Sequence, residues 1–272
     1  MSRIATRLRE LAQEGRKALI PYVVAGDPRP DVTVGLLHAL VEAGADIVEL
    51  GVPFSDPMSE GPVIQRGHER ALANGMSLSR RTGYGPGISR AATLTTPLVL
   101  MGYANPVEHM GHAAFADAAA GAGVDGSLIV DIPPEEVEAL GSELRRAGMD
   151  NIFLVAPTTP EARVAGIAAR ASGFIYYVAL KGVTGAGNLD TDDVASHVAT
   201  IRRHSDLPIA VGFGIKDAAS AARVAAIADG VVVGSALVDL LAQSDGEERD
   251  IPAACEAAAE LLRAIRRGID AG

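Results

Sequence analysis

Two carboxylates, Glu49 and Glu60, occur in one short stretch of the chain. Glu49 stands near the end of an apolar run typical of a strand, residues 45–50, and Glu60 follows in a loop rich in glycine and proline. A carboxylate at the end of a buried strand is poorly solvated, which raises its pKa and favours a role as proton donor. A second carboxylate nearby can accept a proton from the same substrate. Together they predict acid–base catalysis, the alternatives being an ion-paired Glu49 and a solvated Glu60.

Two glycine-containing segments are suited to holding an anion. Gly214 lies in the run VGFGI at 211–215 beside Phe213, and Gly234 and Ser235 open a short helical stretch at 236–241. Glycine lets backbone N–H groups approach an oxyanion, and a helix N-terminus adds a favourable dipole. Because both segments follow predicted strands, we expect a phosphate site between them.

A third glycine-rich segment, residues 182–187, contains Thr184 and Gly185 and has the length of a lid that closes over a site. Its alternative is a plain loop without a role.

Aromatic side chains are scarce, at 4% of the chain, so their positions carry information. Tyr22, Tyr103 and Tyr176 fall in or just after predicted strands and could line a flat apolar ligand. Neighbouring residues of a strand face opposite ways, so Tyr176 and Tyr177 cannot both point inward, and we expect ordinary packing for Tyr177.

These residues need a scaffold, and the hydrophobic pattern supplies one. Eight apolar runs, mostly continuous rather than alternating, indicate parallel strands covered on their outer face. The predicted strands are 19–24, 45–50, 97–102, 126–131, 151–156, 174–179, 209–212 and 230–234. The predicted helices are 3–14, 31–43, 61–74, 111–122, 134–147, 160–171, 191–204, 217–228 and 250–267. The sequence therefore predicts an α/β fold, a (β/α)8 TIM barrel with an extra N-terminal helix, as a single domain over residues 1–272.

Composition excludes several classes of protein. The net charge is −10 with scattered basic residues, which argues against a nucleic-acid partner. A single cysteine excludes a disulfide framework, and the six histidines show no metal-ligand spacing. We expect His68 and His112 to lie on helix surfaces. No apolar stretch is long enough for a membrane span and the charged N-terminus is no signal peptide, so a cytoplasmic location without membrane contact is expected.

Residues 79–96 fit this pattern poorly, because they contain glycines and arginines but no acid and no helical periodicity. Two explanations stay open, a lineage-specific loop and a compensated reading-frame shift, which the coding DNA read in the other frames would distinguish.

The chain resembles the tryptophan synthase alpha subunit family over nearly its whole length apart from 79–96. The resemblance rests on IPYVVAGDP, ELGVPFSDP, GPVIQR, MGYANPV, VDIPPEE, FLVAPTT, KGVTGA, VGFGI and VVVGSALV. Members of this family cleave indole-3-glycerol phosphate to indole and glyceraldehyde 3-phosphate without a cofactor. The resemblance thus implies a lyase of tryptophan biosynthesis.

The resemblance also implies a role for each site residue. Glu49 would protonate the indole ring carbon and take the glycerol hydroxyl proton, Glu60 would accept the indole N–H proton, and Tyr176 would hydrogen-bond near Glu49. The implied substrate-binding residues are Tyr22, Tyr103, Thr184, Gly185, Phe213, Gly214, Gly234 and Ser235. Glu60 stands where the family normally has Asp, and Tyr22 where it usually has Phe.

The implied partner is a beta subunit that carries pyridoxal phosphate, in an α2β2 complex, with Asp56, Pro57, Asn105 and Pro133 on the loops that face it. Two alternatives stay open. One is another phosphate-handling barrel, such as an indole-glycerol-phosphate synthase or a sugar-phosphate epimerase, although no lysine lies in a strand interior and no metal-ligand histidines are visible. The other is a catalytically impaired alpha chain that mainly docks on the beta subunit and regulates it.

Overall fold

A closed barrel of parallel strands forms the centre of the computed structural model, which describes residues 2–78, 95–179, 191–212, 214–243 and 251–272. Its eight strands pair in chain order, and β1 closes on β8. The strands are β1 (Ala18–Val24), β2 (Val48–Gly51), β3 (Leu98–Gly102), β4 (Gly126–Ile129), β5 (Asp150–Val155), β6 (Ile175–Val178), β7 (Ile209–Gly212) and β8 (Gly230–Val233). Each predicted strand coincides with one of these, so the predicted (β/α)8 barrel is confirmed.

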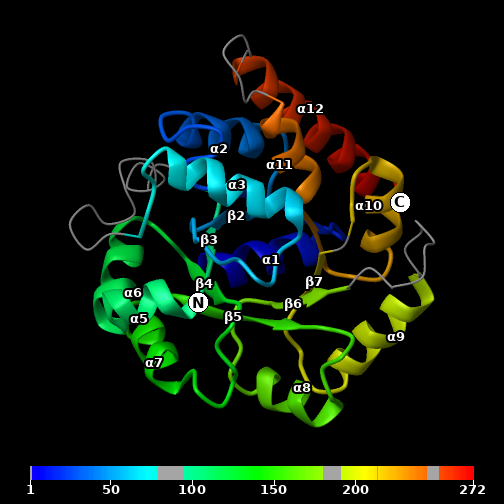
Figure 1. Cartoon of the computed structure of the whole chain (residues 1–272). Coiled ribbons are helices and arrows are strands. Elements are labelled where there is room, and N and C mark those ends of the chain that lie inside the picture. Colours follow the sequence, from blue (N-terminus) through cyan, green and yellow to red (C-terminus); the bar gives the residue numbers. More distant parts are fainter. Residues whose placement is uncertain (1, 79–94, 180–190, 213, 244–250) are drawn as a thin grey trace.

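Helices cover the barrel, most of them on its outer face (Figure 1). They are α1 (Arg3–Gln13), α2 (Thr33–Glu42), α3 (Pro62–Ala73), α5 (Ala104–Met110), α6 (His112–Gly121), α7 (Glu138–Arg146), α8 (Glu161–Ala168), α9 (Thr191–Arg202), α10 (Ala218–Ala225), α11 (Ser235–Ala242) and α12 (Ile251–Asp270). The sequence pattern missed α5, in which Pro106 interrupts the pattern. Proline is tolerated there because it lies in the first turn, where backbone N–H groups have no partner within the helix.

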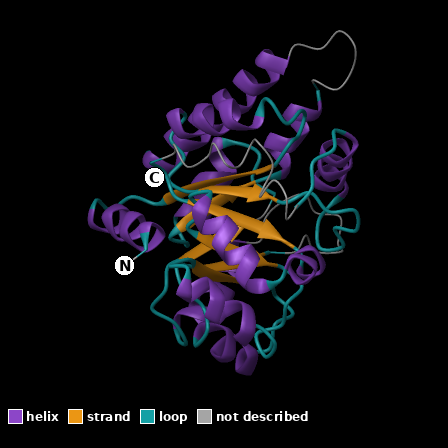
Figure 2. Cartoon of the chain, turned by 90° about the vertical axis from the view of Figure 1, so that its left-hand side faces the viewer, coloured by secondary structure: helices purple, strands orange, loops and turns teal. Residues whose placement is uncertain are grey.

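The extra N-terminal helix, α1, closes one end of the barrel. Its Ile4, Leu8 and Leu11 are buried and join an apolar cluster with interior strand residues such as Ile20 and Ile152. Figure 2 shows α1 at the end opposite the arrowheads of the strands. Helix α1 therefore blocks this end of the barrel and leaves the carboxyl end of the strands for a ligand to approach the interior.

Polar side chains form hydrogen bonds with the backbone at the α1 end of the strands. Asp46, Asp125 and Asp229 precede β2, β4 and β8, and each accepts a hydrogen bond from the first or second N–H of the preceding strand, at 2.9, 2.9 and 3.0 Å. Ser172 does the same before β6, accepting from Asn151 N–H at 2.9 Å. These bonds satisfy strand-end amides that would otherwise be buried without a partner. This end of the barrel is thus occupied by structural contacts.

The loops after the opposite, carboxyl ends of the strands carry the residues with predicted chemistry. Tyr22 and Glu49 are register partners on β1 and β2, so their side chains share the interior face. Of the irregular segment 79–96, residues 79–94 lie outside the described part of the chain.

Candidate active site

Glu49 lies inside the carboxyl end of the barrel and is almost completely buried, with 1% of its surface exposed. Neither carboxyl oxygen has a hydrogen-bond partner among the described residues. Burial, and secondly the negative charge of Glu60, raise the pKa of Glu49 from 4.5 to about 8. Near neutral pH the group is therefore a protonated acid that can donate to a bound molecule.

Two tyrosines flank Glu49 within the barrel, and a glycine makes room for each. A Cβ at Gly51 would overlap the Tyr22 hydroxyl, and a Cβ at Gly212 would overlap the hydroxyl of Tyr176. Tyr176 is partly exposed at the mouth, but its hydroxyl lies inward, where burial and then the charges of Glu49 and Glu60 raise its pKa well above 10.0. Both hydroxyls accordingly stay neutral and serve as hydrogen-bonding groups rather than acids.

Glu60 lies in the loop between β2 and α3, and its side chain is only 4% exposed. This burial contradicts the alternative of a solvated loop acid. Tyr103 borders it: the Tyr103 hydroxyl accepts a hydrogen bond from Ser59 N–H at 3.2 Å, and its ring stacks on Phe54 at a centroid distance of 4.9 Å. Burial, followed by the charge of Glu60, raises the pKa of Tyr103 to about 12. The two glutamates and the three inward tyrosines thus form one polar cluster in an apolar surround.

His68 belongs to the same cluster, so the expectation that it lies on a helix surface is wrong. Its side chain is 2% exposed, and its Nε2 lies 3.0 Å from Glu60 Oε2 and 3.3 Å from the Tyr22 hydroxyl. A signal was present in the sequence, because Ile64, His68 and Ala71 follow helical spacing and define the inward face of α3. His112, in contrast, is partly exposed and pairs with Glu108 at 2.6 Å.

The predicted anion site lies at the ends of two neighbouring strands. Gly212 and Val232 are register partners on β7 and β8, so the loops that carry Gly214 and Gly234 leave the same edge of the barrel. Gly214 has a φ of +43°, which favours glycine, and Gly234 caps α11, whose first residue Ser235 is exposed. Backbone N–H groups at this edge are therefore available to an anionic ligand.

Three predicted substrate-binding residues, Thr184, Gly185 and Phe213, lie outside the described residues. Tyr177 faces away from the interior and stacks on His197 of α9, with ring centroids 5.6 Å apart. Its expected packing role is confirmed.

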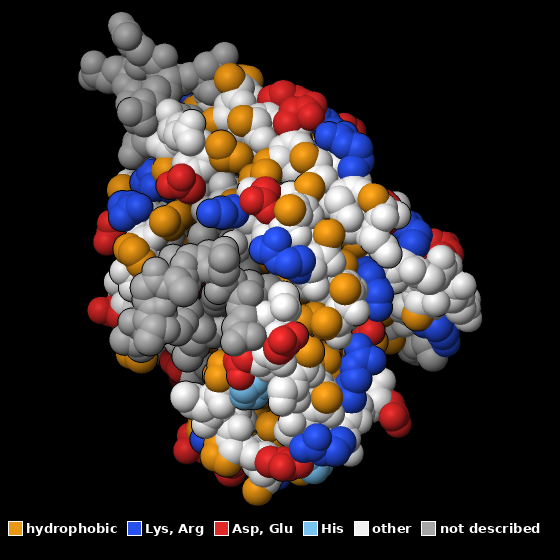
Figure 3. Space-filling model, turned by 90° about the vertical axis from the view of Figure 1, so that its right-hand side faces the viewer, with side chains coloured by type: hydrophobic (Ala, Val, Ile, Leu, Met, Phe, Trp, Pro, Cys, Tyr) orange, Lys and Arg blue, Asp and Glu red, His pale blue; other side chains and the backbone are white. Residues whose placement is uncertain are grey.

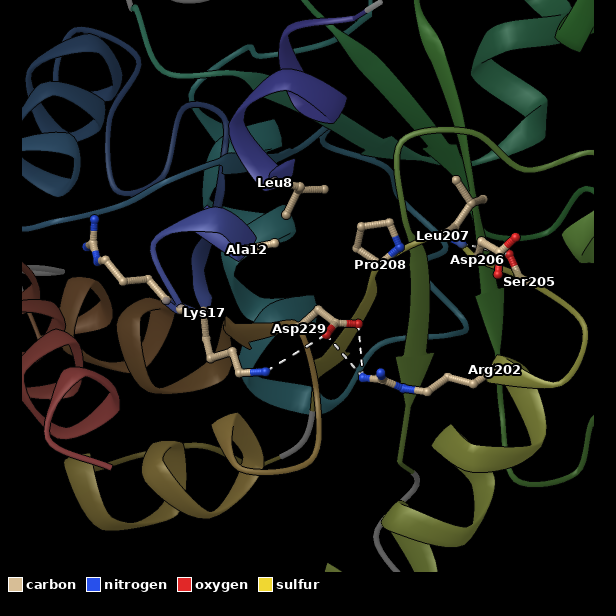
Figure 4. Close-up of a pocket in the computed structure, with 11 residues that line it drawn as sticks. Leu8, Ala12, Lys17, Arg202, Ser205, Asp206, Leu207, Pro208 and Asp229 are labelled. Carbon is tan, nitrogen blue, oxygen red and sulfur yellow. Dashed lines mark hydrogen bonds and ion pairs between the residues drawn. The ribbon is translucent and has the colours of Figure 1, made fainter. Parts of the chain in front are cut away.

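A cavity of about 490 Å³ lies at the α1 end of the barrel, away from Glu49 and Glu60. Figure 4 shows Asp229 between Lys17 and Arg202, with which it forms ion pairs at 3.9 and 3.1 Å. These charges are satisfied within the protein, so this cavity is not our candidate site.

The described part of the chain contains no group of three or more His, Cys, Asp or Glu side chains that could hold a metal ion. None of the helices described is both long and apolar enough to cross a membrane.

The fold and the site together define a class: a (β/α)8-barrel enzyme with a protonated carboxyl group at its closed interior and glycine loops for an anion at its rim. The family model for the tryptophan synthase alpha chain matches residues 8–266. The chain belongs to the tryptophan synthase alpha chain family.

Individual relatives support this membership over the full length. A tryptophan synthase alpha chain from Thioalkalivibrio sulfidiphilus is 59% identical over 270 residues, covering 99% of this chain and 100% of the relative. One from Ralstonia nicotianae is 55% identical and covers 100% of both chains. The crystal structure of tryptophan synthase subunit alpha from Legionella pneumophila superposes with a TM-score of 0.90 at 41% identity and 100% coverage of both chains. The comparisons support the lyase hypothesis and give no support to the docking-only alternative.

Proposed function

We propose that this chain cleaves indole-3-glycerol phosphate to indole and glyceraldehyde 3-phosphate, with Glu49 and Glu60 as its catalytic carboxylates. The observation that carries the proposal is Glu49, a carboxyl group with 1% exposure, no hydrogen-bond partner among the described residues and a pKa raised to about 8. A family in which a ring carbon must be protonated needs such an acid. The alternative of an ion-paired Glu49 has no partner to support it among the described residues.

The reaction balances with these two groups alone. Protonated Glu49 donates to the ring carbon that bears the glycerol chain, while the Glu60 carboxylate accepts the indole N–H proton, which gives the electrophilic indolenine tautomer. Glu49, now a carboxylate, removes the proton of the adjacent glycerol hydroxyl. The carbon–carbon bond breaks, its electron pair returns to the ring, and Glu60 gives its proton back to the ring nitrogen. Both groups end in their starting states.

The other site residues hold the substrate in this proposal. Tyr176 hydrogen-bonds near Glu49, and Tyr22 and Tyr103 line the indole pocket. Gly214, Gly234 and Ser235 bind the phosphate, together with Thr184, Gly185 and Phe213 from the segments outside the described residues. Figure 3 shows acidic and basic side chains interspersed on the face in view, with no continuous basic tract there. On a chain of net charge −10, the phosphate is thus held by local N–H groups rather than by overall charge.

Membership in the family implies a beta-subunit partner, and we propose an α2β2 complex in which pyridoxal phosphate belongs to the beta subunit alone. Among the residues expected to face it, Asp56 and Asn105 are exposed, Pro133 is partly exposed and Pro57 is buried. Next to Pro57, Met58 is 78% exposed. A single domain over residues 1–272, no cofactor on this chain and a cytoplasmic location complete the proposal.

The deciding experiment measures indole release from indole-3-glycerol phosphate, with and without a cognate beta subunit. The unaltered chain should release indole, and the beta subunit should stimulate it. Glu49→Gln should abolish turnover while substrate still binds in an equilibrium titration. No indole release from a folded chain that still activates the beta subunit would instead support a docking-only protein.

A further inference from the structure

His68 connects two side chains of the candidate site, Tyr22 and Glu60. It projects from α3, which packs beside β1 and α11 in the helical layer (Figure 1). Its ring is buried and lies within 3.3 Å of the Tyr22 hydroxyl and 3.0 Å of Glu60 Oε2. A buried imidazole between a hydroxyl and a carboxylate is costly unless its polar atoms are used.

The backbone decides which ring nitrogen carries the proton. Phe54 N–H donates to His68 Nδ1 at 3.1 Å, so Nδ1 must present its lone pair. The neutral ring therefore carries its proton on Nε2, the nitrogen that faces Tyr22 and Glu60. The loop after β2 thus fixes the tautomer and places the Nε2 donor between the Tyr22 hydroxyl and Glu60.

The two contacts of Nε2 differ in alignment. The contact with the Tyr22 hydroxyl meets hydrogen-bond geometry, whereas Glu60 Oε2, although closer, forms no aligned hydrogen bond. A rotation of the terminal carboxylate changes this alignment without moving the helix or the loop. Catalytic hydrogen bonds commonly tighten when substrate binds. When a substrate N–H occupies one carboxylate oxygen of Glu60, the His68 ring is therefore placed to bind the other oxygen and hold the carboxylate in position.

Glutamate needs such a restraint more than aspartate does. Its extra methylene adds one rotatable bond and extends its reach, and a misplacement of about 1 Å at a reacting group costs about 100-fold in rate. The Tyr22 hydroxyl, which phenylalanine lacks, occupies the second contact of the same Nε2. Tyr22 and Glu60 are thus coupled through one ring.

We propose that His68 is the positioning residue for Glu60, and that Tyr22, Glu60 and His68 act as one hydrogen-bonded unit that sets the position of the proton acceptor. This rests on the proposed lyase function. In this proposal His68 exchanges no proton with the substrate, because its Nε2 donor passes from the Tyr22 hydroxyl to Glu60 when substrate binds and its Nδ1 acceptor is used on Phe54 N–H.

Two substitutions at position 68 test the contributions of the two ring nitrogens one at a time. The amide nitrogen of His68→Gln takes the place of Nε2 and keeps a donor for Glu60. The amide oxygen of His68→Asn takes the place of Nδ1 and keeps the acceptor for Phe54, but nothing reaches Glu60. We expect His68→Asn to lower kcat for indole release by about 10- to 100-fold, with KM changed by less than about 3-fold. His68→Gln should recover most of that loss. Equal kcat for His68→Asn and the unaltered chain would overturn the proposal.

A second background tests whether His68 acts through Glu60. In Glu60→Ala, the further change His68→Asn should leave the residual rate unchanged, because the group that it positions is gone. If His68→Asn lowers the rate equally in both backgrounds, its role is structural and the proposal fails. Urea unfolding of every variant shows whether it is folded.

Nitrogen NMR of the His68 ring supplies a readout that needs no turnover. At pH 8 the proton should lie on Nε2 and remain there in Glu49→Gln. A proton on Nδ1 would refute the arrangement even in an active enzyme. The Nε2 tautomer in a chain that releases no indole would instead refute the proposed function and leave the geometry standing.

Discussion

Replacement of Glu49 by glutamine should change how the stability of this protein depends on pH. Glutamine has nearly the shape of a protonated glutamate and cannot ionise. The pKa of Glu49 in the folded protein is about 8 against an ordinary value of 4.5. As pH rises above 4.5, the unfolded chain loses this proton while the folded protein keeps it, so the native state loses stability up to about pH 8. Glu49→Gln escapes that loss.

The magnitude follows from the difference of about 3.5 pH units, at about 1.4 kcal/mol for each unit. Its upper limit is about 5 kcal/mol, reached only above the folded-state pKa. Between pH 5 and pH 8 the free energy of unfolding of Glu49→Gln, relative to the unaltered chain, should therefore rise by about 3 to 4 kcal/mol. Because Glu49 is 1% exposed, solvent screening reduces this value little.

The assay is urea unfolding of both proteins at pH 5, 6, 7 and 8. Any cost of burying the amide is the same at every pH, so the slope of the difference isolates the ionisation. Glu42→Gln, the same chemical change at an exposed position of α2, is the matched control for the substitution itself. If the difference between Glu49→Gln and the unaltered chain does not change with pH, the assignment of Glu49 as a neutral-pH acid is refuted.

Three further changes test the packing around the site and the partner surface. Gly51→Ala should destabilise by about 1 to 3 kcal/mol in urea unfolding, since its Cβ overlaps the Tyr22 hydroxyl, and less in a Tyr22→Phe background; equal losses would contradict that overlap. Arg70→Met removes the guanidinium that binds the buried Asp27 carboxylate at 2.7 and 2.9 Å and should lower the free energy of unfolding by about 3 kcal/mol, whereas Arg29→Met in the exposed pair with Asp31 should lower it far less; equal losses would contradict the role of burial. Met58→Asp should reduce the stimulation of indole release by the beta subunit and spare the rate of the isolated chain; unchanged stimulation would place the interface elsewhere.

The barrel was predictable from sequence because its strands are apolar on both faces. In continuous apolar runs such as 19–24 and 230–234, one set of side chains packs on the outer helices and the other set fills the barrel interior. Parallel sheets that are covered on both faces have this pattern. The missed helix α5 shows the limit, because Pro106 disrupts the periodicity while its position in the first turn leaves the helix intact.

That Tyr176 and Tyr177 point to opposite faces of the strand also followed from sequence, because neighbouring strand residues must alternate, but alternation alone does not say which of them points inward. The burial of His68 had a signal in the spacing of Ile64 and Ala71, but periodicity gives only the face of a helix. It does not predict which side chains of other elements contact that face.

By itself, then, the sequence determined the order of strands and helices, the strand end on which Glu49 lies and the glycines at the rim, all of which depend on local patterns. Only the tertiary structure decided that Tyr22, Glu60 and His68 meet, since they come from β1, a loop and α3. The physical reason is that burial and electrostatics depend on what surrounds a group in space. The pKa of Glu49 and the tautomer of His68 are set by neighbours that the chain brings together only on folding.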